Sequence, residues 1–529
     1  MNPTAAQLLS LAKLSRGIAV LPMLLLFGSS LTPPFAQHGQ RPGRKPQPLL
    51  TGVDSLQIAR LERDIPHLMA AGEIPGLSIA VVRHGKLAWS RGFGVKNSET
   101  QEPVGDNTVF EAASLSKPVF AYAVLKLVEE GKLDLDTPLN KYLPGRYDVG
   151  DDPRLDQITA RRVLSHTTGF PNWRPRGDKT LKIYFTPGDR FSYSGEGFVY
   201  LSRVVEHITG EKLDVFMTRT VLEPLGMTSS NYVWQDDYEK RKTFTHNSVG
   251  GVSGRGKPDK ANAAASLQTT ATDYARFVCA IISIENGSDL QAVTRLKPET
   301  VHLMLTPQIS VAEASSNTLN LPNPTLSTSI SWGLGWGLQK TVDGISFWHW
   351  GDNGDTKAYV VGFPYQKSAV VMFANSANGL SIIRELVDCA LGSQQPALSW
   401  INYEAYNSPA RLMFKAILKS SAETVLANYR KRRQMSDKPQ LPESNLALSE
   451  EQMNRIGYQL LGLKRVKDAI AVFIQNTVDF PDAFNTWDSL AEGYMISGDK
   501  ASAIKYYKKS LQLNPDNTNA LEKLKELGG

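Results

Sequence analysis

A serine and a lysine three residues apart form the segment of the sequence with the clearest chemical potential. Ser114 and Lys117 precede an almost wholly apolar run at 119–128, with Pro118 directly after the lysine. Proline is tolerated only in the first turn of a helix, so a helix here starts no earlier than about Ser114. Residues three apart share a helix face, which brings the Lys117 ammonium within reach of the Ser114 hydroxyl. The pattern predicts a serine nucleophile with a neighbouring cation.

The spacing is weak evidence by itself, because serine precedes lysine by three residues at three other places, namely Ser10 and Lys13, Ser497 and Lys500, and Ser502 and Lys505. The surroundings of Ser114 and Lys117 distinguish them, since a lysine without a partner is expensive to bury in an apolar helix. The alternative is a helix-capping serine beside a lysine that extends its ammonium to solvent.

A tyrosine in a loop is the second residue with catalytic potential. Tyr193 lies within a turn-rich segment at 186–198, just before a helical pattern at 201–208. If its phenol meets the Lys117 ammonium, the attraction would lower the pKa of the phenol towards neutrality, with burial opposing part of that change. The pair could then act as general base for Ser114 and later for water.

Aromatic residues and a glycine form a third candidate segment between two strand-like runs. It consists of His349, Trp350 and Gly351, followed by Asp352. Glycine in a strand lets the backbone approach a ligand closely. The alternative is that the aromatic side chains simply belong to the hydrophobic core.

Strand patterns occur at both ends of this region, and helical patterns lie between them. Apolar runs at 77–82 and 87–90, separated by a turn that includes Gly85, predict a β-hairpin. Further strand-like runs occur near Trp332, Ile345, Lys357 and Ala369. This order predicts an α+β fold in which helices surround one antiparallel sheet.

Three short motifs follow one another along the chain, Ser114-x-x-Lys117, Tyr193-Ser194-Gly195 and His349-Trp350-Gly351. Their order resembles the serine β-lactamase-related family, which includes class C β-lactamases, D,D-peptidases and family VIII esterases. The resemblance spans about residues 56–395, with further similar segments at 163–170, 224–229 and 264–273. It implies a β-lactamase/penicillin-binding-protein-like antiparallel sheet with a helical subdomain.

The resemblance also implies roles for individual residues. Ser114 would be the acylated nucleophile, and Lys117 and Tyr193 would move its proton. The backbone N–H groups of Ser114 and Asp352 would form the oxyanion hole, where each donor contributes about 3 kcal/mol to acyl transfer. No cofactor and no metal ion are expected. The residues expected to line the substrate pocket are His349, Trp350 and Gly351.

Two departures from the family's motifs bear on the substrate. Gly195 stands where the family has an asparagine, which removes an amide that would hold the acylamino group of a β-lactam or peptide. His349 and Trp350 stand where the family has lysine and threonine, so a mostly neutral imidazole replaces a permanent cation. We therefore expect a hydrolase for a small neutral ester, or for an amide without a free carboxylate. The alternatives are a β-lactamase or D,D-peptidase acting on cell-wall-like substrates, and a catalytically inactive ligand sensor or scaffold that uses its C-terminal repeats.

The C-terminal region repeats with a period of 34 residues, which separates Ala469 from Ala503, Phe473 from Tyr507, and Pro481 from Pro515. These positions resemble the tetratricopeptide helix-turn-helix repeat. We expect a hydrolase domain at 56–395, a helical linker at 396–446 and an all-α tetratricopeptide-like domain at 447–529. The repeats are expected to dock on the larger domain or to bind a protein or peptide partner.

The first 36 residues are typical of an export signal peptide. Lys13 and Arg16 precede an apolar run at 17–28 that is too short to cross a bilayer comfortably. We expect cleavage after Ala36, a polar linker at 37–55, and a periplasmic or extracellular location. An uncleaved N-terminal membrane anchor is the alternative.

Composition and motifs exclude several classes of protein. A net charge of +6 spread over 529 residues is too dilute for a nucleic-acid-binding surface. The two cysteines, Cys279 and Cys389, lie in apolar runs, so free thiols are expected rather than a disulfide scaffold. The histidines form no pair with zinc-binding spacing, and His166 is expected to make structural hydrogen bonds in a loop.

Overall fold

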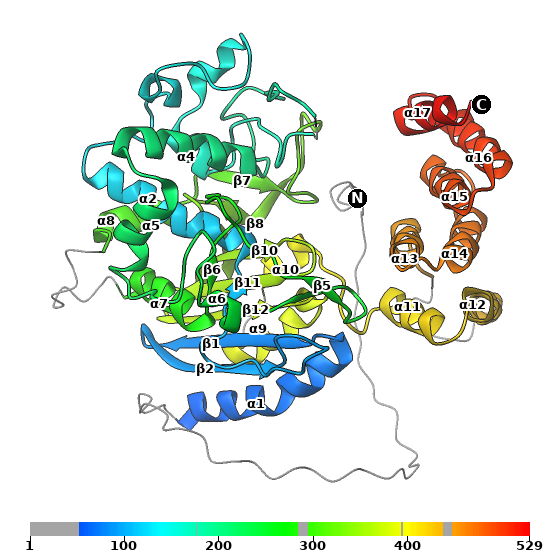
Figure 1. Cartoon of the computed structure of the whole chain (residues 1–529), viewed down its shortest axis with the longest axis horizontal. Coiled ribbons are helices and arrows are strands. Elements are labelled where there is room, and N and C mark those ends of the chain that lie inside the picture. Colours follow the sequence, from blue (N-terminus) through cyan, green and yellow to red (C-terminus); the bar gives the residue numbers. More distant parts are fainter. Residues whose placement is uncertain (1–51, 176, 284–294, 393–394, 437–446, 529) are drawn as a thin grey trace. The chain divides into compact units, whose positions relative to one another are not determined.

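The computed structural model describes residues 52–175, 177–283, 295–392, 395–436 and 447–528 (Figure 1). The predicted signal peptide at 1–36 lies outside these residues, as does the predicted linker up to residue 51. The last part of that predicted linker is helical instead, because helix α1 (Gly52–Gly72) begins at residue 52. Among the helices described, none is both long enough and apolar enough to cross a membrane.

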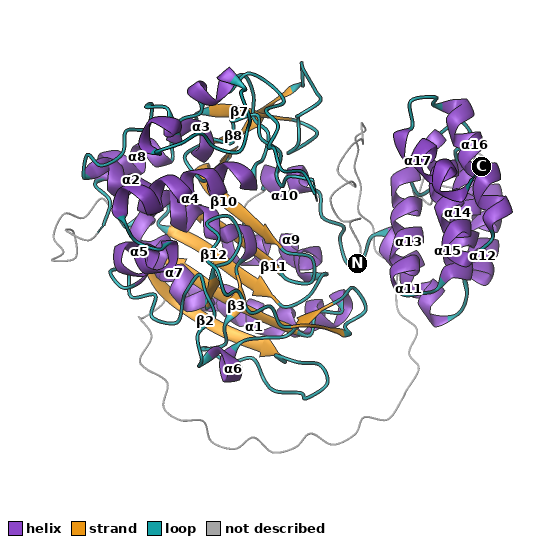
Figure 2. Cartoon of the chain, turned by 45° about the horizontal axis from the view of Figure 1, so that its top comes forward, coloured by secondary structure: helices purple, strands orange, loops and turns teal. Residues whose placement is uncertain are grey.

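The chain forms two compact units, residues 1–403 and 404–529. Within its described residues, the first unit holds an eight-stranded antiparallel sheet with strand order β2-β1-β12-β11-β10-β9-β8-β7 (Figure 2). Strands from the two ends of the unit are neighbours, since β1 pairs with both β2 and β12. The predicted α+β fold is confirmed. The strands of the sheet are Gly76–Arg83 (β1), Lys86–Gly94 (β2), Ile309–Ala312 (β7), Leu326–Trp332 (β8), Gly337–Thr341 (β9), Gly344–Asp352 (β10), Lys357–Phe363 (β11) and Ser368–Ala374 (β12).

The predicted hairpin is present as β1 and β2. The two residues of its turn, His84 and Gly85, have φ angles of 53° and 72°, a left-handed pair whose twist matches that of the flanking strands. The sequence does not predict β7 and β9, which are only 4 and 5 residues long. Runs this short carry too little alternation to be recognised.

Helices cover both faces of the sheet. Strands β11 and β12 are buried along their whole length, and since successive side chains point to opposite faces, each face must be covered. Helix α7 (Ala271–Ile282) packs on β1, β2 and β12, whereas α9 (Ile383–Leu391) packs on β12 and on α1.

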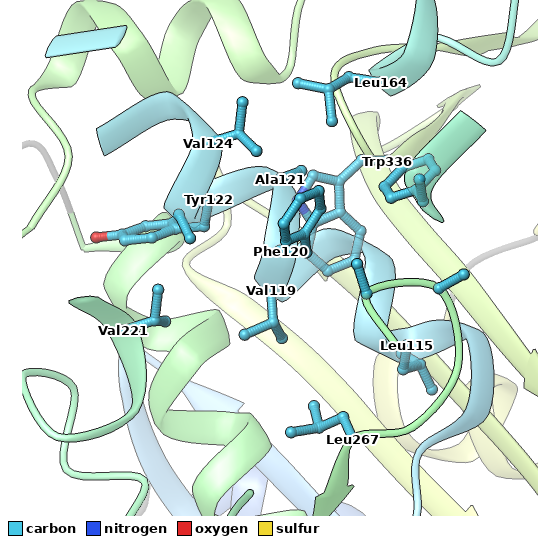
Figure 3. Packing of buried hydrophobic residues seen from close by; sticks show 14 of the residues in the cluster. Leu115, Val119, Phe120, Ala121, Tyr122, Val124, Leu164, Val221, Leu267 and Trp336 are labelled. Carbon is cyan, nitrogen blue, oxygen red and sulfur yellow. The ribbon is translucent and has the colours of Figure 1, made fainter. Parts of the chain in front are cut away.

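Helix α2 (Ser116–Glu129) is the buried centre of the helical region, as its apolar sequence predicts. Its side chains pack among Leu164, Val221, Leu267 and Trp336 (Figure 3). The other helices of this unit are Ala160–Leu164 (α3), Gly195–Thr209 (α4), Leu213–Met217 (α5), Tyr238–Arg241 (α6), Pro298–Met304 (α8) and Pro396–Ile401 (α10). Two short sheets accompany them, formed by Phe110–Glu111 (β3) with Gln268–Thr269 (β6) and by Thr245–His246 (β4) with Val252–Gly254 (β5).

The described residues of the second unit form helices joined by turns and short loops, and no strands. The division at 403/404 falls inside the predicted linker at 396–446, so α10 belongs to the first unit and the next helices to the second. Residues 437–446 of that linker lie outside the described residues. The helices of the second unit are Pro409–Lys419 (α11), Ala422–Ser436 (α12), Glu450–Gly462 (α13), Val466–Asp479 (α14), Phe484–Ser497 (α15), Lys500–Leu513 (α16) and Thr518–Leu527 (α17).

The 34-residue period corresponds to two helix pairs, α13 with α14 and α15 with α16. Small residues allow the paired helices to approach each other. At Gly457 on α13, an added Cβ would overlap the ring of Phe473 on α14. The predicted all-α repeat fold is therefore present, and its periodic small residues serve packing.

Candidate active site

The Ser114 hydroxyl lies at the entry of α2. Ser114 belongs to a 3₁₀ turn, η1 (Ala113–Leu115), that leads directly into the helix. Ala113 has a φ of 50°, which is unusual for a residue with a side chain, so the backbone turns sharply just before the serine. Pro118 stands in the first turn of α2, as predicted. Backbone N–H groups in this turn have no acceptor within the helix, so the N–H that proline lacks is not missed there.

Buried hydrogen bonds fix this turn. The Ser116 hydroxyl donates to the Ala113 carbonyl oxygen at 2.6 Å and accepts from the Leu267 backbone N–H at 3.0 Å. The Tyr274 hydroxyl, on α7, donates to the Leu115 carbonyl oxygen at 2.9 Å. The backbone on either side of the candidate nucleophile is therefore held in one conformation by neighbouring segments.

Lys117 is the buried amine beside the nucleophile. Its Nζ donates to Ser114 Oγ at 3.0 Å and to the Ala264 carbonyl oxygen at 2.8 Å. Its side chain is 0% exposed, whereas Ser114 is half-buried. Burial lowers the pKa of the Lys117 amine from 10.5 to about 7. Such an amine can both take up and release a proton at neutral pH, which general acid–base catalysis requires.

The structure brings Tyr193 to the same place. Lys117 Nζ lies 4.8 Å from the centroid of the Tyr193 ring, so the serine, the lysine and the tyrosine meet. Burial raises the pKa of the Tyr193 phenol well above its ordinary value, and the nearby Ser114 hydroxyl opposes only part of that rise. The predicted fall in the pKa of this phenol is wrong, because loss of hydration on burial is the largest influence on it.

His166 holds the segment that carries Tyr193. Its Nδ1 accepts a hydrogen bond from the Ser194 backbone N–H at 3.0 Å, and its carbonyl oxygen accepts one from the Ser192 N–H at 2.8 Å. The imidazole also stacks on the Tyr193 ring, with the two centroids 4.3 Å apart. Burial lowers the pKa of His166 well below its ordinary value, so the ring is neutral. The hydrogen-bonding role predicted for His166 is confirmed.

Strand β10 brings the third motif beside the nucleophile. An added Cβ on Gly351 would overlap the Ala112 carbonyl oxygen, so only glycine lets the strand pass so close to the turn before Ser114. The ring of Trp350 lies near Tyr193, with 5.0 Å between the two centroids. All three predicted motifs therefore meet around one hydroxyl.

The His349 imidazole is neutral and fully buried. Its Nδ1–H donates to the Trp350 carbonyl oxygen at 2.7 Å. Burial, with a smaller contribution from Lys117, lowers the pKa of His349 to about 3. The pKa of His166 is likewise lowered by burial first and then by Lys117 and His349. The site thus encloses three basic groups, and the two imidazoles carry no charge at neutral pH.

Asp352, at the end of β10, is held by two residues that the sequence does not single out. Lys357 Nζ donates to Asp352 Oδ1 at 2.6 Å, and the Tyr403 hydroxyl donates to Oδ2. Lys357 is the direct partner of Asp352 on β11, so knowledge of the strand register would have found it. These bonds orient the peptide at 352, and the oxyanion-hole role of the Ser114 and Asp352 N–H groups stays a prediction.

Other reactive side chains lie apart from this group. Cys279 and Cys389 are free thiols, as predicted, and burial raises the pKa of both. A cavity of about 420 Å³ between α1 and α9 is lined by none of the predicted site residues. Within the part of the chain that the structure describes, no three His, Cys, Asp or Glu side chains are grouped so as to hold a metal ion.

Comparison with known proteins agrees with this arrangement. The family model described as Beta-lactamase matches residues 61–384, more than half of the chain. The chain belongs to the β-lactamase family. A Tetratricopeptide repeat model matches residues 484–517, which include helices α15 and α16 of the second unit.

Curated relatives of this β-lactamase-family chain match it over part of their length. Esterase EstB of Burkholderia gladioli is 29% identical over 217 residues, which is 35% of this chain and 54% of EstB. Protein flp of Staphylococcus aureus (strain N315) is 24% identical over 216 residues, or 38% of this chain and 43% of that protein. The chain therefore spans about half the length of the curated relatives it matches.

Solved structures of other proteins share the fold of the first unit. A class C β-lactamase has a TM-score of 0.54 with 20% identity, covering 65% of this chain and 97% of its own. The octameric penicillin-binding protein homologue from Pyrococcus abyssi has a TM-score of 0.53 with 23% identity, covering 68% and 81%. The β-lactamase/penicillin-binding-protein-like fold implied by the motifs is confirmed.

Proposed function

We propose that this protein is a serine hydrolase in which Ser114 forms an acyl-enzyme. The observation that carries the proposal is the 3.0 Å hydrogen bond between Lys117 Nζ and Ser114 Oγ, made by an amine whose pKa is lowered by burial to about 7. In its neutral form this amine can accept the hydroxyl proton as the oxygen attacks a carbonyl carbon.

The reaction has two halves in this proposal. Ser114 Oγ bonds to the carbonyl carbon of the substrate while its proton passes to Lys117. The bond to the leaving alcohol then breaks, the alcohol oxygen takes that proton, and the serine remains esterified. In the second half, water gives a proton to the neutral amine as it attacks the acyl carbon. Ser114 Oγ recovers this proton when the carboxylic acid departs.

In the proposed reaction Tyr193 acts as a neutral phenol. Because burial raises its pKa, it keeps its proton and enters the reaction as a hydrogen-bond donor, not as a phenolate. Its proximity to both Ser114 and Lys117 allows it to stabilise the attacking oxygen or to relay the proton to the leaving group. The general base is therefore the amine.

A neutral ester is the proposed substrate, and an amide without a free carboxylate is the second choice. The imidazole of His349 is uncharged, so it offers no cation to a substrate carboxylate. Gly195 offers no side-chain amide to an acylamino group. The relationship to a protein named Esterase EstB supports the same choice.

Turnover of p-nitrophenyl butyrate and of a cephalosporin by the purified protein tests the proposal. We expect faster turnover of the ester, and covalent labelling by a fluorophosphonate probe that Ser114→Ala abolishes. Faster cleavage of the cephalosporin would instead indicate a β-lactamase. Failure of the probe to label the unaltered protein would indicate a ligand sensor.

For the second unit we propose a protein or peptide partner bound through residues 447–529, which the tetratricopeptide match supports. We also propose that the protein is exported, on the pattern of residues 1–36. A phosphatase reporter that is active only outside the cytoplasm, fused after residue 529, tests the location. Reporter activity is expected, and an inactive reporter on an intact fusion would contradict export.

A further inference from the structure

The indole of Trp173 occupies the space beside Gly195. A Cβ added at Gly195 would lie 2.8 Å from Trp173 Cη2 and 2.9 Å from the Asn172 carbonyl oxygen, closer than real Cβ atoms come. Gly195 begins helix α4 with ordinary helical backbone angles, so the backbone itself does not need a glycine. The glycine is required because the segment carrying the indole stands against it.

Trp173 is held in this position by its chain neighbours. The Asn172 carbonyl oxygen accepts hydrogen bonds from the N–H groups of Gly195 and Glu196, both at 3.0 Å. The Asn172 side-chain oxygen accepts a further bond from the Gly195 N–H at 3.0 Å. On the other side, the Arg174 N–H donates to a Glu196 carboxylate oxygen at 3.1 Å. The backbone on both sides of Trp173 is thus tied to the start of α4.

The indole itself is open to solvent. Trp173 is 45% exposed, although large aromatic side chains are usually covered. Among the described residues its ring has no aromatic partner, and its N–H has no hydrogen-bond acceptor. A fixed backbone that presents an uncovered indole is suited to contact with a bound molecule.

The position of Trp173 relates it to the reacting groups. Gly195 follows Tyr193 by two residues, and the Ser194 hydroxyl between them donates to the Pro171 carbonyl oxygen at 2.8 Å. The segment before Trp173 is therefore bonded to the segment that carries the candidate catalytic phenol.

We propose that Trp173 binds the acyl group of the substrate and selects esters whose acyl group carries an aromatic ring. This inference rests on the proposed serine hydrolase function. An aromatic ring gains both apolar contact and favourable ring geometry against an indole, whereas a methyl group is too small to reach it. In this protein the indole of Trp173 therefore takes the place of the asparagine amide that the family's motif has at the position of Gly195.

The test compares p-nitrophenyl phenylacetate with p-nitrophenyl acetate, which have the same leaving group. We expect Trp173→Ala to lower kcat/KM for the phenylacetate about tenfold and for the acetate less than about twofold. Trp173→Phe should restore most of the preference, since it keeps an aromatic ring. Tyr365→Ala, which removes an aromatic ring 92% exposed in the turn after β11, is the matched control and should change neither value.

Different outcomes would contradict the role of Trp173 and the proposed serine hydrolase function. If Ser114→Ala leaves turnover of both esters unchanged, the serine hydrolase proposal fails. If turnover depends on Ser114 but Trp173→Ala leaves the ratio of the two kcat/KM values unchanged, or lowers both equally, only the role of Trp173 is overturned. If Trp173→Leu restores the preference for the phenylacetate as fully as Trp173→Phe does, this result would also contradict selection by an aromatic ring.

Discussion

The same pair of residues at the same spacing occurs in both units with opposite surroundings. In the first unit, Lys117 is 0% exposed and donates to Ser114 Oγ. In the second, the hydroxyl of Ser502 donates to Asp499 Oδ2 at 2.7 Å at the start of α16, and Lys505 is exposed. One pair is a candidate catalytic group and the other begins an ordinary surface helix.

The difference shows that the surroundings of a lysine, not its distance from a serine, decide its reactivity. Removal from water destabilises an ammonium ion and so makes the neutral amine available. Helix α2 is enclosed on all sides by the core of its unit, whereas a repeat helix packs on its neighbours and leaves one face in water. Four predictions use this comparison, and each pairs a change at the buried site with a control.

The largest effect is expected from removal of the nucleophile. Ser114→Ala should lower kcat/KM for p-nitrophenyl butyrate by at least about 10⁴-fold, because no acyl-enzyme can form. Ser502→Ala removes the same hydroxyl from the other pair and should leave kcat/KM within about twofold of the unaltered protein. A comparable loss in both variants would contradict the contrast between the two units.

The next largest effect is expected from removal of the amine. Lys117→Met keeps the length of the side chain but cannot accept a proton, and should lower kcat/KM about 10³-fold. Lys505→Met should have no effect. Steady-state kinetics measures both, and circular dichroism verifies that Lys117→Met is folded. Retention of full activity in that folded variant would remove Lys117 from the proposed mechanism.

A smaller loss is expected at the phenol. Tyr193→Phe keeps the stacked ring and removes only the hydroxyl, so kcat/KM should fall about 10²-fold. The acid limb of the pH profile should stay near pH 7, because burial sets the pKa of the Lys117 amine at about 7. Tyr507→Phe, at a buried tyrosine of the repeats, is the control. Movement of the acid limb in Tyr193→Phe would mean that the phenol, not the amine, is the group that titrates.

The smallest effect concerns stability. Burial lowers the pKa of Lys117 from 10.5 to about 7, so between these values the unfolded chain binds a proton that the folded chain does not. The free energy of unfolding therefore rises with pH across this window, by at most about 1.4 kcal/mol per pH unit, and this contribution stops changing below pH 7. We expect urea denaturation at several pH values to show a smaller rise in the free energy of unfolding for Lys117→Met. The rise for Lys505→Met should equal that of the unaltered protein. Equal slopes in all three proteins would show that Lys117 is not buried as described.

Local sequence patterns predict much of the fold. The hairpin, the buried helix and the 34-residue repeat depend on neighbours along the chain, and all are present. The short strands β7 and β9 are not predicted, because their place depends on the partner strand rather than on their own pattern. The division between the units at 403/404 follows packing and has no composition signal at that point.

The candidate site is only partly predictable, for a similar reason. The approach of Lys117 to Ser114 follows from helix geometry, whereas the arrival of Tyr193 was expected only from the family resemblance. The direction of the change in the pKa of Tyr193 depends on burial, which spacing does not give. Trp173 beside Gly195 is a contact between segments 22 residues apart, and no motif indicates it.

The enclosure of Lys117 with two histidines limits how much charge the interior accepts. Burial first, and the nearby Lys117 next, lowers the pKa of both His166 and His349, so a proton on the amine disfavours a second one nearby. At neutral pH both imidazoles are therefore uncharged, and of these three groups the Lys117 amine is the one that can carry a proton. In the proposed mechanism, a proton taken from Ser114 therefore stays on the Lys117 amine, from which the departing alcohol would take it.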